Sequence, residues 1–415
     1  MTARAKNLTL LHTALGVRSL YDSVCFCNRC GLCTSACPAY QENPLEPNSP
    51  RGRNQAMRLF LEGKLKGKEH RAALRALLTS CSLCGKCIRV CPGQIPTPKH
   101  MLEFRRLLNF QLLPVSLFYL LRLRGTAPRL FNFMVHTGLW ANRLKMLSLF
   151  AVIPGMGWLK HTCEILPKQT PKPFNAPLQT HPNFIYLPSL EAEFFLPEVA
   201  YNSYFLAAKK HRVVVWKNTA SGLFEYLYGD IRFAQKTLRS LILRHQYTGN
   251  GSLPLLCDNI DVYHFLKQAP QLFEEFPSWQ EKAHHFAQHI VFITDILPKR
   301  FKNRTRFEKP ILLMPSSILE SADTALKTAP QILQTLFKKN FVECGYKQDY
   351  AIAAGYGFVR GSHANAYQLQ AVRTVAQNQA QTVFVLSGLA ALELGYSLRR
   401  FYPSARVRHI ADLNG

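Results

Sequence analysis

The stretch CNRCGLCTSACP at residues 27–38 returns with the same cysteine spacing as CSLCGKCIRVCP at residues 81–92. Both stretches fit the pattern C-x2-C-x2-C-x3-C-P, whose cysteines ligate cubane iron–sulfur clusters. Two copies in one chain predict two [4Fe-4S] clusters. Because neighbouring clusters exchange electrons, the repeat also predicts an electron-transfer function.

The longer last interval of each run points the fourth cysteine away from the first three and toward the other cluster. The pattern therefore predicts two crosswise ligand sets. One set is Cys27, Cys30, Cys33 and Cys91, and the other is Cys81, Cys84, Cys87 and Cys37. Gly31 and Gly85 follow the second cysteine of each run, where the missing Cβ lets backbone amides approach cluster sulfur.

Two other uses of cysteine fit less well. A zinc ion takes four ligands and gives no reason to repeat a four-cysteine run that ends in proline. Residues 1–20 lack the apolar core of a signal peptide, so we expect a cytosolic chain without disulfides. Of the remaining cysteines, we expect Cys25 and Cys257 to be buried thiols rather than ligands.

The charge is strongly positive and unevenly placed. The 415 residues carry a formal net charge of +26, and residues 1–173 contain 25 Lys and Arg against seven Asp and Glu. Such a surface suits an acidic partner, an anionic membrane or nucleic acid. Part of the charge offsets the anionic clusters, but residues 101–173 are basic without containing any cluster ligand.

The pattern of elements predicts an α+α/β fold. We expect an α-helical ferredoxin-like domain at residues 1–105, with helices over residues 1–24, 50–63, 69–80 and 100–109. A basic apolar helical segment follows at 106–173, and a linker rich in Pro, Lys, Gln and Thr at 174–182. Two related α/β lobes then occupy residues 183–300 and 309–415.

The two lobes are predicted from an internal duplication. The segment FIYLPS at residues 184–189 resembles ILLMPS at 311–316, and each is followed by a helical stretch. Further strands are expected at 212–216 and 253–257 in the first lobe, and at 341–344 and 382–386 in the second. Alternation of strands and helices indicates parallel sheets.

The basic segment at 106–173 contains two apolar runs, and neither reaches the ~20 residues that a membrane-spanning helix needs. Basic residues beside Leu, Phe and Trp fit helices that lie in a membrane interface. A helical bundle covered by a partner subunit and a purely internal core are the other two interpretations. We expect His100, His136 and His161 to be packing or interface residues rather than ligands.

Residues 25–105 resemble the iron–sulfur subunit of glycolate oxidase, and also the lactate-utilisation iron–sulfur proteins and the heterodisulfide reductase family. The resemblance rests on both cysteine runs, the helical insert between them and the segment SPRGR at 49–53. It implies a helical ferredoxin-like domain that takes electrons from an FAD-containing subunit oxidising a 2-hydroxy acid. It also implies delivery to a membrane quinone or another acceptor.

The resemblance is fainter over residues 183–415, where the family has cysteine-rich repeats with Cys-Cys-Gly elements. This chain has Ala220, Ser221 and Gly222 at one such position, and AGYG at 354–357 at the other. Ser189, Ser316 and Ser387 stand where strand-end cysteines are expected. A cluster cannot be built from serine, glycine and one lone cysteine, so we expect no cluster in this half.

The sequence thus predicts a non-catalytic electron-transfer subunit of a hetero-oligomer. We expect it to serve a glycolate or D-lactate type dehydrogenase, and to lie on the cytoplasmic, inner face of the cell membrane. An iron–sulfur subunit of an anaerobic glycerol-3-phosphate dehydrogenase-like complex is one alternative. A nucleic-acid-binding protein with structural clusters is another, although the aromatic residues of 101–160 are not interleaved with basic ones.

Overall fold

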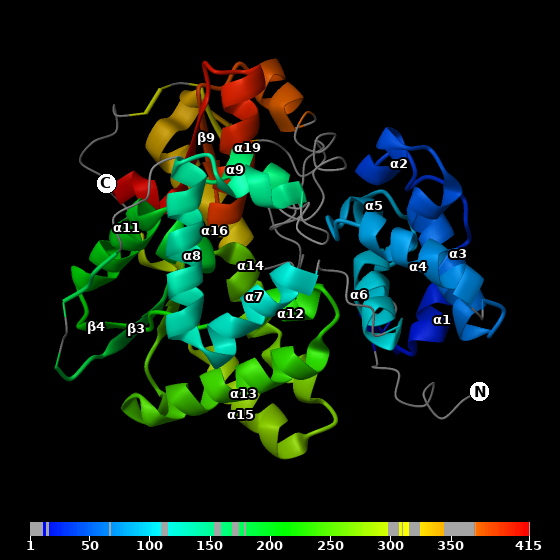
Figure 1. The fold of residues 1–415 in the computed structure, drawn as a ribbon, viewed down its shortest axis with the longest axis horizontal. Helices are drawn as coiled ribbons and strands as arrows, with labels where there is room; N and C mark the ends of the chain where they lie inside the picture. Colours follow the sequence, from blue (N-terminus) through cyan, green and yellow to red (C-terminus); the bar gives the residue numbers. More distant parts are fainter. Residues whose placement is uncertain are drawn as a thin grey trace.

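The computed structural model places a group of helices beside a larger α/β body (Figure 1). The structure describes residues 11–13, 16–65, 68–108, 115–152, 159–167, 174–177, 180–297, 307–308, 310–314, 324–343, 369 and 371–414. The helical group is N-terminal, and the α/β body contains two four-stranded sheets. This arrangement confirms the α+α/β fold class.

The N-terminal group consists of a hairpin and six helices. The helices are α1 (Leu20–Cys25), α2 (Pro38–Glu42), α3 (Pro50–Leu61), α4 (Lys68–Ser80), α5 (Lys86–Arg89) and α6 (Thr97–Leu108). The predicted helices at 50–63, 69–80 and 100–109 are therefore confirmed. Helix α3 begins as its sequence indicates, because the Ser49 hydroxyl caps the N–H of Gly52 and Pro50 occupies the first turn.

The predicted helical start of the chain is wrong for residues 11–18. There β1 (Leu11–Thr13) pairs antiparallel with β2 (Gly16–Arg18), and helix begins only at Leu20. The cap explains the boundary, since Ser19 is extended and its hydroxyl accepts a hydrogen bond from the N–H of Asp22. Residues 1–10 lie outside the described residues.

Three hydrogen bonds between α1, α3 and α6 position the helices of this group. The His100 ring is fully buried, with Nε2 2.6 Å from Ser23 Oγ and Nδ1 2.9 Å from Asn54 Oδ1. The Asn54 amide group donates to Thr97 Oγ1, so its oxygen accepts from His100. His100 is therefore a neutral packing residue, as predicted, and burial lowers its pKa to about 3.

The basic segment is helical, as predicted. It contains α7 (Val115–Thr126), α8 (Pro128–Arg143), the 3-10 helix η3 (Leu147–Val152) and α9 (Leu159–Ile165). Helices α7 and α8 run across the near side of the first α/β lobe (Figure 1). No helix among the described residues is long and apolar enough to cross a membrane.

Each α/β lobe contains one parallel sheet. The first contains β3 (Phe184–Leu187), β4 (Val213–Val215), β5 (Leu255–Cys257) and β6 (Ile290–Phe292), with helices α10 (Leu190–Phe194), α11 (Pro197–Ala208), α12 (Leu223–Leu227), α13 (Ile231–Tyr247), α14 (Ile260–Lys267) and α15 (Pro277–Gln288). The second contains β7 (Ile311–Met314), β8 (Phe341–Glu343), β9 (Thr382–Val385) and β10 (Arg406–His409), with α16 (Thr324–Phe337) and α19 (Gly388–Phe401).

The two sheets have the same topology. Their strand orders are β4-β3-β5-β6 and β8-β7-β9-β10, and every neighbouring pair is parallel. The six predicted strands are present, and the outer strands β6 and β10 complete the sheets. The topology supports the duplication that the FIYLPS and ILLMPS segments indicate, while the domain boundaries given above remain predictions.

Arg105 and Gly229 make contacts between the helical group and the first lobe. Arg105 on α6 is buried, and its guanidinium group donates to the carbonyl of Leu227 at the end of α12 at 2.6 Å. Gly229 has a φ of +92°, and a Cβ there would lie 3.1 Å from the backbone of Arg105. In the predicted linker, Phe174 is buried and packs against Tyr186, Tyr201 and Tyr204. This part of the linker therefore belongs to the core of the first lobe.

Candidate iron–sulfur site

Two loops carry the repeated cysteines. The first cysteine loop (residues 27–37) joins α1 to α2, and the second cysteine loop (residues 81–91) follows α4 and contains α5. Their backbones match at two positions. Arg29 and Leu83, each two residues after the first cysteine, have φ values of 56° and 62°, and Gly31 and Gly85 have values of 87° and 73°. Left-handed residues of this kind turn successive N–H groups toward one concavity, which suits an anionic cluster.

The thiols that interact electrostatically fall into two groups. The pKa of Cys33 is raised to about 11, mainly by burial and to a lesser extent by the thiols of Cys27 and Cys91. Cys91 comes from the opposite loop, so this group joins cysteines of the first run to the last cysteine of the second run.

The second group joins the first three cysteines of the second run to the last cysteine of the first run. Burial raises the pKa of Cys84, and the thiols of Cys37 and Cys81 add to the effect. Burial also raises the pKa of Cys87 well above its usual value, with added contributions from Cys84, Cys81 and Cys37. Desolvated thiols of this kind are protonated at neutral pH without a metal, so cluster binding releases protons.

Helix α3 touches both groups through its first turns. A backbone hydrogen bond from Arg51 lowers the pKa of Cys33, against the larger effect of burial. The buried guanidinium group of Arg53 reaches Cys37 Sγ at 3.5 Å and Ser80 Oγ at 2.9 Å. From the sequence, the SPRGR segment was expected to start a helix and to carry the family resemblance, and no contact with the cysteines was predicted. The available signal for contacts with the cysteines was the position of Arg51 and Arg53 in the first turns of a helix capped by Ser49.

Polar groups also surround the second loop. The N–H of Leu83 donates to Cys81 Sγ at 3.4 Å, and Arg105 donates to the carbonyl of Cys81 at 2.8 Å. Lys86 is buried, and its charge lowers the pKa of Cys84 against the effect of burial. Donors and positive charges near sulfur stabilise a thiolate-bound cluster. Arg105 and Lys86 were not predicted, because only the folded chain shows what they face.

The thiols of the two loops are the donors that an iron–sulfur cubane takes. Among the described residues, no group of three or more His, Cys, Asp or Glu side chains has the geometry to hold one ion. In a cubane each cysteine binds a different iron, so the sulfurs stand farther apart than the ligands of one ion. The two groups of thiols, with hydrogen-bond donors and positive charges around them, provide the ligand type that a cubane needs.

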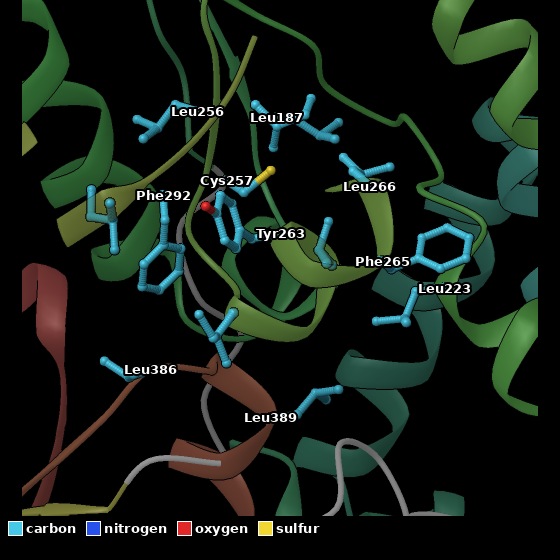
Figure 2. Close-up of a cluster of buried hydrophobic side chains, with 14 of the residues drawn as sticks. Leu187, Leu223, Leu256, Cys257, Tyr263, Phe265, Leu266, Phe292, Leu386 and Leu389 are labelled. Atoms are coloured by element: carbon cyan, nitrogen blue, oxygen red, sulfur yellow. The ribbon is translucent and has the colours of Figure 1, made fainter. Parts of the chain in front are cut away.

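The two groups contain seven of the eight loop cysteines, and the eighth, Cys30, is exposed. The cysteines outside the loops have different surroundings. Cys257 is fully buried at the end of β5, and Figure 2 shows it among apolar side chains that include Leu187, Tyr263 and Leu266. Burial raises the pKa of Cys257 well above its usual value. The expectation of a buried thiol is thus confirmed for Cys257. For Cys25 it is wrong, because that residue is half-buried at the end of α1. Cys344 lies outside the described residues.

The strand-end serines take structural roles. Ser189 caps α10 by accepting from the N–H of Ala192. The Ser387 hydroxyl accepts from the Asn259 amide at 3.2 Å, and the N–H of Ile260 donates to the carbonyl of Leu386 at 3.0 Å. These bonds join the carboxyl ends of β5 and β9, so serine and asparagine hold the lobes together at this seam. Ser316 and residues 354–357 lie outside the described residues.

His136 and His161 are the other two histidines that the sequence predicts to be packing or interface residues. His136 is exposed on α8, where its Nδ1 lies 2.8 Å from the carbonyl of Asn132 and its ring contacts Phe194. The side chain of His161 lies outside the described residues.

A helical scaffold with two matched four-cysteine loops is the arrangement expected of an iron–sulfur domain of the ferredoxin-like class. Comparison with known proteins agrees, because the family model described as a 4Fe-4S dicluster domain matches residues 23–95. Residues 23–95 are therefore similar to a 4Fe-4S dicluster domain. No solved structure matches the chain significantly.

Two curated proteins resemble the same region. The glycolate oxidase iron–sulfur subunit of Escherichia coli (strain K12) is 38% identical over 72 residues, which cover 17% of this chain and 16% of that protein. The probable glycolate oxidase iron–sulfur subunit of Bacillus subtilis (strain 168) is 32% identical over 84 residues, 20% of this chain and 18% of that protein. The resemblance inferred from the cysteine runs is confirmed, and it spans less than a fifth of each relative.

Proposed function

We propose that this chain is the electron-transfer subunit of an oxidoreductase complex and has no catalytic residue of its own. The observation that carries the proposal is the crosswise grouping of the thiols, in which Cys33 interacts with Cys91, and Cys84 with Cys37. This grouping supports two [4Fe-4S] clusters. Cys27, Cys30, Cys33 and Cys91 would hold one, and Cys81, Cys84, Cys87 and Cys37 the other. Bound clusters accept and release single electrons.

The chain's own residues have three roles in this proposal. The cysteine thiols lose their protons and fix the positions of the two groups. Arg53 and the N–H of Leu83 donate to sulfur at 3.5 and 3.4 Å, which favours the more negative, reduced state. The helices around the second loop exclude water and keep these donors in place, since Leu83 and Lys86 are buried.

The partners are inferred from the relatives, which are subunits of glycolate oxidase by name. We infer that an FAD-containing subunit oxidises a 2-hydroxy acid of the glycolate or D-lactate type and passes electrons to this chain. The acceptor is a quinone or another carrier at the membrane. The complex is then a hetero-oligomer on the inner, cytoplasmic face of the cell membrane.

Substrate-driven reduction tests this function. The tagged full-length chain is purified anaerobically from its native cells with any flavoprotein that accompanies it, and glycolate or D-lactate is added. We expect a flavin spectrum in the complex and the EPR signals of reduced clusters after addition of one of these acids. Clusters that dithionite reduces but no 2-hydroxy acid reduces would contradict the proposed donor.

The same sample separates the alternatives. Reduction by glycerol 3-phosphate alone would identify the anaerobic glycerol-3-phosphate dehydrogenase-like complex. Tight, salt-sensitive binding of duplex or single-stranded nucleic acid in a gel-shift experiment would favour the nucleic-acid-binding alternative. The match of residues 23–95 to the dicluster family, together with the resemblance to two glycolate oxidase subunits, favours the 2-hydroxy-acid complex over both.

A further inference from the structure

Exposed apolar side chains are concentrated on one short part of the molecule. Of the 19 exposed large hydrophobic residues among those described, ten lie between residues 119 and 152. Those of α8, η3 and the turn between them form what we call the outer face: Leu130, Phe133, Met134, Trp140, Leu144, Met146, Leu149, Phe150 and Val152. Their exposure excludes the interpretation of this segment as a purely internal core.

The direction of the outer face is fixed by the opposite side of α8. Phe131 and Leu139 are buried there, and the Phe131 ring lies 5.5 Å from that of Phe194 in the first lobe. Leu130, Phe133 and Trp140 follow helical spacing on the other side, with exposures of 49, 66 and 58%. Rotating α8 to hide them would bring Phe131 into water, so the apolar side stays outward.

Two ion pairs from α7 anchor this segment to the first lobe. Arg124 is buried, and its guanidinium group lies 3.0 Å from Glu193 Oε2. Arg122 lies 2.5 Å from Asp230 Oδ2, with its guanidinium carbon 4.8 Å from the centre of the Phe233 ring. These ion pairs hold α7 against the first lobe, so the segment that carries the outer face is fixed in position.

The charge of the segment is of one sign. No Asp or Glu occurs between Glu103 and Glu164, whereas eight Lys and Arg fall within those 60 residues. Arg129, Arg143 and Lys145 are exposed at the two ends of the apolar stripe of α8. Long basic side chains beside exposed Trp, Phe and Leu suit a boundary between hydrocarbon and anionic headgroups.

We propose that the outer face of α8 and η3 binds the surface of an anionic lipid bilayer, with its apolar side chains inserted at the headgroup level. A bilayer fits because it has anionic headgroups next to an apolar interior, and because binding to it requires no groove on the protein. This binding rests on the proposed function for its purpose, because it would hold the chain near a membrane acceptor. Lipid binding itself can be measured without electron transfer. An acidic protein partner is the competing occupant.

Vesicle flotation of the full-length, cluster-containing protein tests this. Vesicles of phosphatidylcholine alone are compared with vesicles that also contain phosphatidylglycerol, at low salt. We expect flotation with the anionic vesicles and a loss of partitioning of about 25-fold in the double variant Arg143→Gln/Lys145→Gln, since each charge contributes about fivefold. Phe133→Ser should lower partitioning by about tenfold.

Matched controls lie elsewhere on the surface. Lys236→Gln on α13 and Tyr247→Ser, an 87% exposed residue at the end of α13, should leave partitioning unchanged. Unaltered EPR signals in every variant would show that the fold is intact. Absence of flotation, or equal partitioning of outer-face variants and controls, would overturn the proposal. Either failure leaves substrate-driven cluster reduction, and therefore the proposed relay, untouched.

Discussion

The two cysteine loops share a sequence pattern and two left-handed backbone positions but not an environment. In the first loop Cys30 is exposed and Leu32 is 55% exposed, whereas in the second loop Ser82, Leu83 and Lys86 are all buried. The cysteine spacing therefore determines how the chain turns around sulfur, and the neighbouring helices determine what else the sulfur meets. We expect two clusters that are alike in structure and different in reduction potential.

The largest effect should come from removing ligands across the two loops. Cys84→Ser and Cys37→Ser belong to the same predicted ligand set, so both should abolish the same cubane signal in EPR of the reduced protein. Cys30→Ser and Cys91→Ser should abolish the other. If Cys37→Ser instead affected the signal that Cys30→Ser removes, each run would hold its own cluster and the crosswise assignment would be wrong.

Acid should affect both loops together, because His100 supports the helices that position both. Its folded pKa of about 3 is far below the usual 6.5, so its stabilising effect is present above pH 6.5 and is lost as the pH falls toward 3. Between pH 6.5 and 4 the loss is on the order of 3 kcal/mol.

Denaturant unfolding of the cluster-free chain at several pH values measures this contribution. The variant His100→Gln should show a smaller decrease in stability over the same interval, because glutamine does not titrate. Equal pH slopes for both proteins would mean that His100 does not remain neutral in the folded chain.

Replacing Arg53 should change the reduction potential of one cluster more than that of the other. Arg53→Gln removes a buried positive charge near Cys37 and should lower the potential of that cluster by on the order of 50 to 100 mV. Arg51 is 34% exposed and bound to Glu46, so Arg51→Gln should shift either potential much less. Potentiometric EPR titration measures both, with Arg53→Lys as the variant that keeps the charge. Equal shifts in both clusters would contradict the difference in environment.

The smallest effect concerns Cys257, a buried cysteine outside both loops. Cys257→Ala leaves a small gap among Leu187, Tyr263 and their neighbours, and should cost about 1 kcal/mol of unfolding free energy. Iron content and both EPR signals should stay the same as in the unchanged chain. Loss of iron in this variant would mean that the first lobe contributes a ligand.

Local signals in the sequence were sufficient for a large part of the fold. The helices over α3 and α4 and the six repeated strands follow from caps, prolines and short apolar runs, which act within a few residues. The hairpin at 11–18 was not predicted, because a three-residue strand is too short to show the alternation of apolar and polar residues that indicates a strand. Phe174 was assigned to a linker because its Pro-rich surroundings conceal a contact with residues far along the chain.

The candidate site could likewise be predicted from local signals only in part. Cysteine spacing indicates the ligand pattern, since neighbouring thiols in one tight loop must face one concavity. It does not indicate that Arg53 reaches Cys37, or that Arg105 binds the carbonyls of Cys81 and Leu227. Those contacts depend on how α3 and α6 pack. The same is true of α8, where the sequence gives an apolar segment but not the side that faces outward.

The most direct measurement is the iron and acid-labile sulfide content of the anaerobically prepared full-length chain, with zinc determined on the same sample. We expect about eight iron and about eight sulfide per chain and no zinc. About four irons or fewer, or stoichiometric zinc in their place, would contradict it.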